Sequence, residues 1–152
     1  MKNWIIPLFA LTLGFSQLTA ALAESGDTSA IRIIAPVDNA IVALADNPQK
    51  TLDIAFATSG FVVRPHGQCE GIPNCGHVHV QIDPENAPCN YQGKPGNNTN
   101  AATGGDHIIA LFALCATPTG PHTLTVSLAN DNHSPVLVNG KPATSTIHVI
   151  MK

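Results

Sequence analysis

The sequence predicts an all-β protein, and three observations support that fold class. Short stretches in which apolar and polar residues alternate recur along the chain, as expected for half-buried strands. Residues that favour turns separate these stretches, and the chain contains 12 Gly and 12 Pro. No segment has the spacing of a convincing amphipathic helix, and no internal repeat is visible. The chain is therefore expected to fold as packed sheets.

The N-terminal residues are expected to be a secretory signal peptide. Lys2 precedes an apolar stretch that ends in the small-residue cleavage site Ala21-Leu22-Ala23. Polar residues dilute the apolar stretch and no cysteine follows the expected cut, so neither a membrane anchor nor a lipoprotein is favoured. We therefore predict a signal peptide over residues 1–23 and one soluble domain over residues 24–152, located in the periplasm or secreted.

The first half of this domain contains four expected strands. Residues 30–34 alternate and end at turn residues that begin with Pro36. Residues 51–56 place three apolar side chains on one face, and residues 61–63 form a brief apolar strand. Residues 76–83 alternate valine and isoleucine with polar side chains, so one face of this strand would enter the core.

The second half begins with a long expected loop over residues 84–106, which is rich in Pro, Gly and Asn. Residues 107–115 are mostly apolar, and we favour a strand over a short helix because the neighbouring segments are strands. Residues 122–128 alternate most clearly, and residues 146–151 form the last strand. About seven short strands separated by turns predict an immunoglobulin-like antiparallel β-sandwich.

Charge and motifs exclude several function classes. Seven basic and ten acidic residues give a formal net charge of −3, and loss of Lys2 with the signal peptide makes the chain more negative. No basic patch is available for a phosphate backbone, so nucleic acid is not an expected partner. No nucleophile elbow, phosphate loop or dinucleotide fingerprint occurs, and we expect no enzyme.

The four cysteines indicate two disulfides, because an even number in an exported chain is usually paired. Three pairings are allowed. We favour Cys69 with Cys75, which closes a short loop, and Cys89 with Cys115, which ties the long polar loop to a buried strand. The alternative is that Cys69 and Cys75 are thiolate ligands beside the histidines, which an oxidising compartment disfavours.

Two histidines on one strand are the main candidate for chemistry. His77 and His79 alternate with valines, so both imidazoles would share the face opposite the core. Neutral imidazole binds copper and zinc well, and two neighbouring rings can converge on one ion. The alternative interpretation is an ordinary polar strand face on which these histidines only form hydrogen bonds.

Further ligands would have to come from other segments. His122 and His133 bracket one strand and the turn after it, and His107 opens another strand. Asp131 could serve as a carboxylate ligand or accept a ring N–H from a ligand. The alternative for His122 and His133 is that each fixes a turn through backbone contacts. The two histidines interpreted as ordinary loop and strand residues are His66 and His148.

The histidine strand resembles that of a family of exported bacterial proteins described as a domain of unknown function, whose members carry Gly-His-His-His-Leu-Leu-Ile-Asp. Residues 76–83 match its first and third histidines, its isoleucine and its aspartate, with Val78 in place of the middle histidine. Residues 120–135 are similar to the family's later Pro-Gly-x-His-Thr-Leu strand and its Asp/His turn ending in Pro, with Thr119 in place of the proline.

Two weaker resemblances imply copper. Residues 120–136 are similar to the final hairpin of periplasmic copper-resistance carriers of the C type, although Glu24 stands where those carriers begin with histidine. His77-Val78-His79 followed by Cys89 resembles copper-zinc superoxide dismutase, without the rest of its ligands. The resulting hypothesis is an exported, non-enzymatic protein that binds copper, or alternatively zinc. Competing hypotheses are an adhesion-type module that docks another envelope protein or a glycan through the loop over residues 84–106 or a sheet edge, and a dismutase-like redox enzyme.

Overall fold

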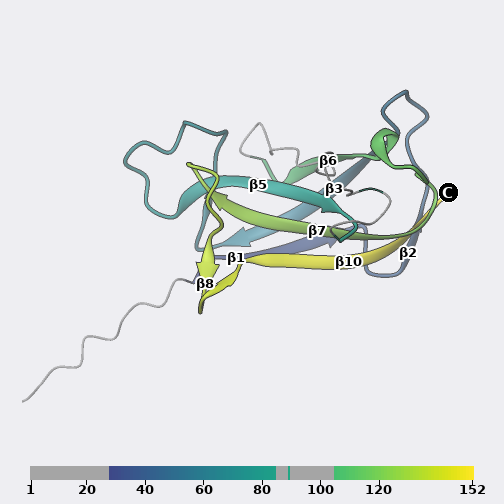
Figure 1. Cartoon of the computed structure of the whole chain (residues 1–152). Helices are drawn as coiled ribbons and strands as arrows, with labels where there is room; N and C mark the ends of the chain where they lie inside the picture. The colour runs from purple at the N-terminus through teal and green to yellow at the C-terminus, as the bar shows by residue number, and fades with distance from the viewer. Residues whose placement is uncertain (1–27, 85–88, 90–104) are drawn as a thin grey trace, which may run out of the picture.

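The computed structural model describes residues 28–84, 89 and 105–152, and it confirms an all-β immunoglobulin-like sandwich. Two sheets face each other, as Figure 1 shows, and a small hairpin lies beside them. The predicted signal peptide and most of the predicted loop over residues 84–106 lie outside the described residues. Within the described part of the chain, no helix is long and apolar enough to span a bilayer.

The two sheets and the hairpin account for all ten strands of the described residues. The three-stranded sheet has the order β1 (Ala30–Ala35), β3 (Thr51–Ser59), β6 (His107–Leu111). The five-stranded sheet has the order β2 (Ala40–Val42), β10 (Thr144–Met151), β7 (Gly120–Asn130), β5 (Cys75–Ile82), β4 (Val62–Val63). The hairpin consists of β8 (Leu137–Val138) and β9 (Lys141–Pro142).

The central strands pair antiparallel as predicted, whereas both edges of the five-stranded sheet are parallel. The edge strand β2 pairs in parallel with β10, and β4 pairs in parallel with β5. The strands β2, β8 and β9 were not predicted, because their two or three residues carry no readable alternation. The equally short β4 was predicted from the apolar run over residues 61–63. The parallel edge at β4 matters most, because it places the loop after Val63 beside the start of β5.

The strand predicted over residues 107–115 is wrong in its second half. The strand β6 ends at Leu111, and Phe112–Leu114 forms a short 3-10 helix, η1. Leu111 pairs with Thr51, the first residue of β3, so β3 offers no further residue with which β6 could pair. The N–H of Phe112 instead donates to the carbonyl of Lys50 at 3.1 Å. The apolar segment therefore continues into the core, but its strand pairing with β3 ends at Leu111.

The core lies between the two sheets and follows the predicted alternation. On β5 and β7 the even-numbered residues point inward, and those fully buried or nearly so are Val78, Val80, Ile82, Leu124, Val126 and Leu128. Because strand side chains alternate between faces, the odd-numbered residues of β5 lie on the outer face of this sheet. His77 and His79 therefore lie on the outer face, whereas His122 of β7 lies on the inner one.

Gly76 allows β5 and β7 to approach closely just before the histidines. A Cβ at this position would overlap the carbonyl oxygen of Ala129 on β7. We expect Gly76→Ala to lower the free energy of unfolding by about 3 kcal/mol, because two strands would have to move apart. Urea denaturation would measure the loss.

The matched control is Gly71→Ala. This glycine has a φ of 72° but no neighbour that a Cβ would meet, so only backbone strain of about 1 kcal/mol is expected. Equal losses of unfolding free energy in the two variants would show that the close approach of β5 and β7 is not the reason why position 76 needs glycine.

Candidate metal centre

The outer face of β5 carries two stacked imidazoles. The ring centroids of His77 and His79 are 4.8 Å apart with an interplanar angle of 28°. The cross-strand partners on β7 are Ala129 and Ser127, whose small side chains leave room for the rings. His77 is fully buried although it lies on the outer face, so other segments must cover it.

One of these covering segments is the turn after β7. The N–H of His133 donates to the carbonyl of Asn130 at 2.9 Å, and a φ of 65° at His133 turns the chain back over the sheet. This turn brings Nδ1 of His133 to 3.0 Å from Nε2 of His77. One of these two nitrogens must donate a proton and the other must accept it. The structure therefore brings His133 next to His77 and His79.

The other covering segment is the loop between β4 and β5, which contributes His66. Its ring centroid lies 4.4 Å from that of His133 and 5.8 Å from that of His77. Nδ1 of His66 is 2.6 Å from the carbonyl oxygen of Asp131, which can only accept, so Nδ1 carries the proton. The lone pair of His66 is thus on Nε2, the nitrogen that could bind an ion.

His66, interpreted from the sequence as an ordinary loop residue, lies beside His77 and His133 in the structure. The disulfide between Cys69 and Cys75 is a signal that could have found it, because that bridge returns the loop to the start of β5. A second tie is the N–H of Gly67, which donates to Oδ1 of Asp131 at 2.7 Å. Neither the parallel pairing of β4 nor this contact has a local sequence pattern.

The donor atoms of these residues are close enough to share an ion. One ligand atom each from His77, His79 and His133 lie within 4.8 Å of one another. The same limit holds for a second, overlapping group made of His66, His77 and Asp131. Nitrogens bound to one zinc ion at about 2.0–2.1 Å lie roughly 3.4 Å apart in a tetrahedron, so small side-chain movements would suffice. We call these five residues the histidine cluster.

Burial keeps His77 in the form that metals require. Burial is the largest cause that lowers the pKa of His77 from 6.5 to about 4, followed by positive charge on His79, His133 and His66. The carboxylate of Asp131 opposes this shift. Nδ1 of His77 is buried and makes no hydrogen bond to the described residues. A neutral imidazole with a lone pair available near pH 7 is the protonation state of a metal ligand.

Two predicted ligands lie elsewhere. His122 lies on the inner face of β7, where its Nδ1 is 3.0 Å from Oδ2 of Asp83. His107 belongs to β6 of the opposite sheet, where its Nδ1 is 2.9 Å from Oδ1 of Asp53. The hydrogen bond to Asp53 raises the pKa of His107. The prediction that His107 and His122 join His77 was therefore wrong.

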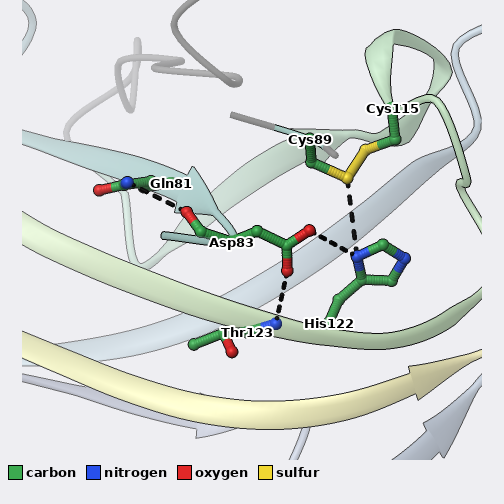
Figure 2. Close-up of polar contacts among 6 residues, drawn as sticks. All are labelled: Gln81, Asp83, Cys89, Cys115, His122 and Thr123. Atoms are coloured by element: carbon green, nitrogen blue, oxygen red, sulfur yellow. Dashed lines mark hydrogen bonds and ion pairs between the residues drawn. A yellow bond between two sulfur atoms is a disulfide. The ribbon is translucent and has the colours of Figure 1, made fainter. Parts of the chain in front are cut away.

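Both favoured disulfides are confirmed. Cys69 pairs with Cys75, and Cys89 pairs with Cys115. The alternative in which Cys69 and Cys75 serve as thiolate ligands does not fit these bonds. The second disulfide lies beside His122 and Asp83, and Figure 2 shows the imidazole between the carboxylate and the sulfur.

No protein-family model matches the chain, and no curated protein matches it. Among solved structures, the chain is similar to fibronectin(III)-like modules of CbhA from Clostridium thermocellum, with a TM-score of 0.44 and 11% sequence identity. The match covers 80% of this chain and 95% of the module chain. The resemblances to the exported family and to the copper carriers stay predictions.

Proposed function

We propose that this protein is an exported, non-enzymatic metal-binding protein that holds a transition-metal ion in the histidine cluster. One observation carries the proposal: ligand atoms of His77, His79 and His133, which come from a strand and a distant turn, lie within 4.8 Å of one another. An exported location is supported by the two disulfides, which are typical of oxidising compartments.

The chemistry of the donors favours copper, with zinc as the alternative. The cluster supplies imidazoles and one carboxylate but no sulfur, which suits divalent copper and zinc better than monovalent copper. Copper(II) binds such nitrogen sites more tightly than zinc(II). On binding, the ion would replace the proton shared by His77 and His133 across their 3.0 Å contact.

The differing exposure of the ligands suits a carrier or buffer. His77 is fully buried, whereas His66 and His133 are exposed. The buried ligand would hold its position in the metal-free protein, and the two exposed ligands would admit and release the ion. Acidification would favour release, because protons compete with the metal for imidazole nitrogens.

Calorimetric titration of the mature protein with Cu(II) and with Zn(II) tests the proposal. We expect one site that His77→Ala/His79→Ala weakens by roughly 100-fold or more, because two ligands are lost. The matched control is His107→Ala/His148→Ala, which removes two exposed histidines that each contact an aspartate. Equal binding by the wild type and His77→Ala/His79→Ala would overturn the proposal.

A second candidate function is docking to another envelope protein. Exposed apolar side chains at the β2 edge favour it, since Ile41 is 60% exposed and its register partner Ile150 is 45% exposed. Under this alternative the histidines are only polar groups. Absence of Cu(II) and Zn(II) binding in the calorimetric titrations would favour this alternative.

A further inference from the structure

A second cluster of potential ligands lies on the inner face of the five-stranded sheet, around the disulfide that ends at Cys115. Nδ1 of His122 faces two groups, Oδ2 of Asp83 at 3.0 Å and Sγ of Cys89 at 3.6 Å (Figure 2). Oδ1 of Asp83 accepts the backbone N–H of Thr123 at 3.0 Å, which fixes the carboxylate.

The spacing of these donors matches a zinc site. In a tetrahedral site with Zn–S near 2.3 Å and Zn–N near 2.0 Å, sulfur and nitrogen are separated by about 3.5 Å, and nitrogen and oxygen by about 3.3 Å. The observed 3.6 Å from Cys89 to His122 agrees with the first value, and the 3.0 Å from His122 to Asp83 is close to the second. Cys115 is bonded to Cys89 and would supply the fourth ligand.

Burial also points to a site. Asp83, Cys89 and His122 are 8%, 2% and 5% exposed, and the ring of Phe112 packs edge-on against His122 with centroids 5.3 Å apart. Nε2 of His122 is buried and makes no hydrogen bond to the described residues. Titratable groups are rarely buried in this way without a functional or structural reason.

We propose that Asp83, Cys89, Cys115 and His122 form a redox-controlled zinc site that exists only when their disulfide is reduced. In the disulfide form the two sulfurs are bonded to each other and cannot act as thiolate ligands. An external dithiol supplies two electrons and two protons, the Cys89–Cys115 bond breaks, and the dithiol becomes a disulfide. Zn(II) then displaces the two thiol protons, and the imidazole proton moves from Nδ1 to Nε2.

The charge of the two thiolates supports this exchange. Two thiolates neutralise the charge of one zinc ion, so the metal is not left as an uncompensated buried cation. Asp83 and His122 also line a hollow of about 300 Å³.

This site is independent of the histidine cluster, because His122 and His77 lie on opposite faces of the same sheet. Cobalt(II) is the suitable probe, since sulfur ligation adds a thiolate-to-cobalt charge-transfer band that imidazole and carboxylate ligands cannot produce. Failure of the histidine cluster to bind metal would leave this band unchanged.

The experiment uses His77→Ala/His79→Ala as the parent protein, so that the histidine cluster does not contribute Co(II) bands, and compares its oxidised form with the form reduced by a phosphine, each titrated with Co(II). We expect the charge-transfer band and intense tetrahedral visible bands only after reduction, at one Co(II) per chain, and their loss when Zn(II) is added. The matched control is Cys69→Ser/Cys75→Ser, which lacks the other disulfide and should keep both sets of bands. Cys89→Ser/Cys115→Ser should lose them.

Asp83→Asn and His122→Ala keep both thiols and test the other two ligands. We expect the tetrahedral visible bands to weaken at least tenfold in each variant, with circular dichroism of the oxidised form checking the fold. The proposal is overturned if the reduced protein shows no charge-transfer band. It is equally overturned if Cys89→Ser/Cys115→Ser keeps the bands, or if neither Asp83→Asn nor His122→Ala changes them.

Discussion

Saturating metal is expected to raise the thermal stability of the mature protein by a large margin. At one hundred times the Kd, binding to the folded state alone adds about 2.7 kcal/mol to the free energy of unfolding. For a domain of this size that corresponds to a rise in Tm of roughly 10 °C. The unfolded chain gains little, because the ligands come from the β4–β5 loop, from β5 and from the turn after β7.

Thermal unfolding followed by circular dichroism, with and without Cu(II) or Zn(II), measures this rise. A chelator should reverse it. The variant His77→Ala/His79→Ala should unfold at the same temperature in both conditions, whereas His107→Ala/His148→Ala should keep the full rise. A rise that survives in the first variant would assign the stabilisation to other metal-binding residues.

Acid is expected to destabilise the metal-free protein through His77. The folded pKa of about 4 lies below the ordinary value of 6.5, so the unfolded chain binds the proton more readily than the folded one. The stability that His77 contributes is therefore complete above pH 6.5, is lost as the pH falls between 6.5 and 4, and is absent below 4. The corresponding loss is on the order of 3 kcal/mol when complete, and about 2 kcal/mol by pH 5.

Urea denaturation at several pH values between 7 and 4 measures this dependence. In His77→Gln the free energy of unfolding should fall less as the pH drops from 6.5 to 4, because glutamine does not titrate. His107→Gln is the control with the opposite sign: Asp53 raises the pKa of His107, so that histidine contributes stability that is present at low pH and lost as the pH rises through its folded pKa. An equal loss of unfolding free energy between pH 6.5 and 4 in the wild type and in His77→Gln would refute the role given to burial at His77.

The fold could be predicted because long strands carry their own pattern. Alternation along β5 and β7 identified both strands and the residues that each contributes to the core. Short elements such as β2 and η1 could not be found in this way. Hydrogen bonds to distant segments define them, including the contact from the N–H of Phe112 to Lys50.

The histidine cluster could be predicted only in part. The same alternation that placed His77 and His79 together also excludes His122, because that residue shares the inward face of Leu124 and Leu128. Alternation applied to both strands would therefore have placed His122 on the opposite face from His77 and His79. His66 is different, since its position depends on the parallel pairing of β4 and on contacts with Asp131, which lies far away in the sequence.

A crystal structure of the mature protein soaked with Zn(II), with anomalous scattering measured at the zinc edge, would test the central claim most directly. We expect one strong peak at the histidine cluster in the oxidised protein, about 2.0–2.1 Å from a ring nitrogen of each of His77, His79 and His133. A peak confined to the exposed pairs His107 with Asp53 or His148 with Asp38 would contradict the proposed site. So would a map with no zinc peak at the cluster.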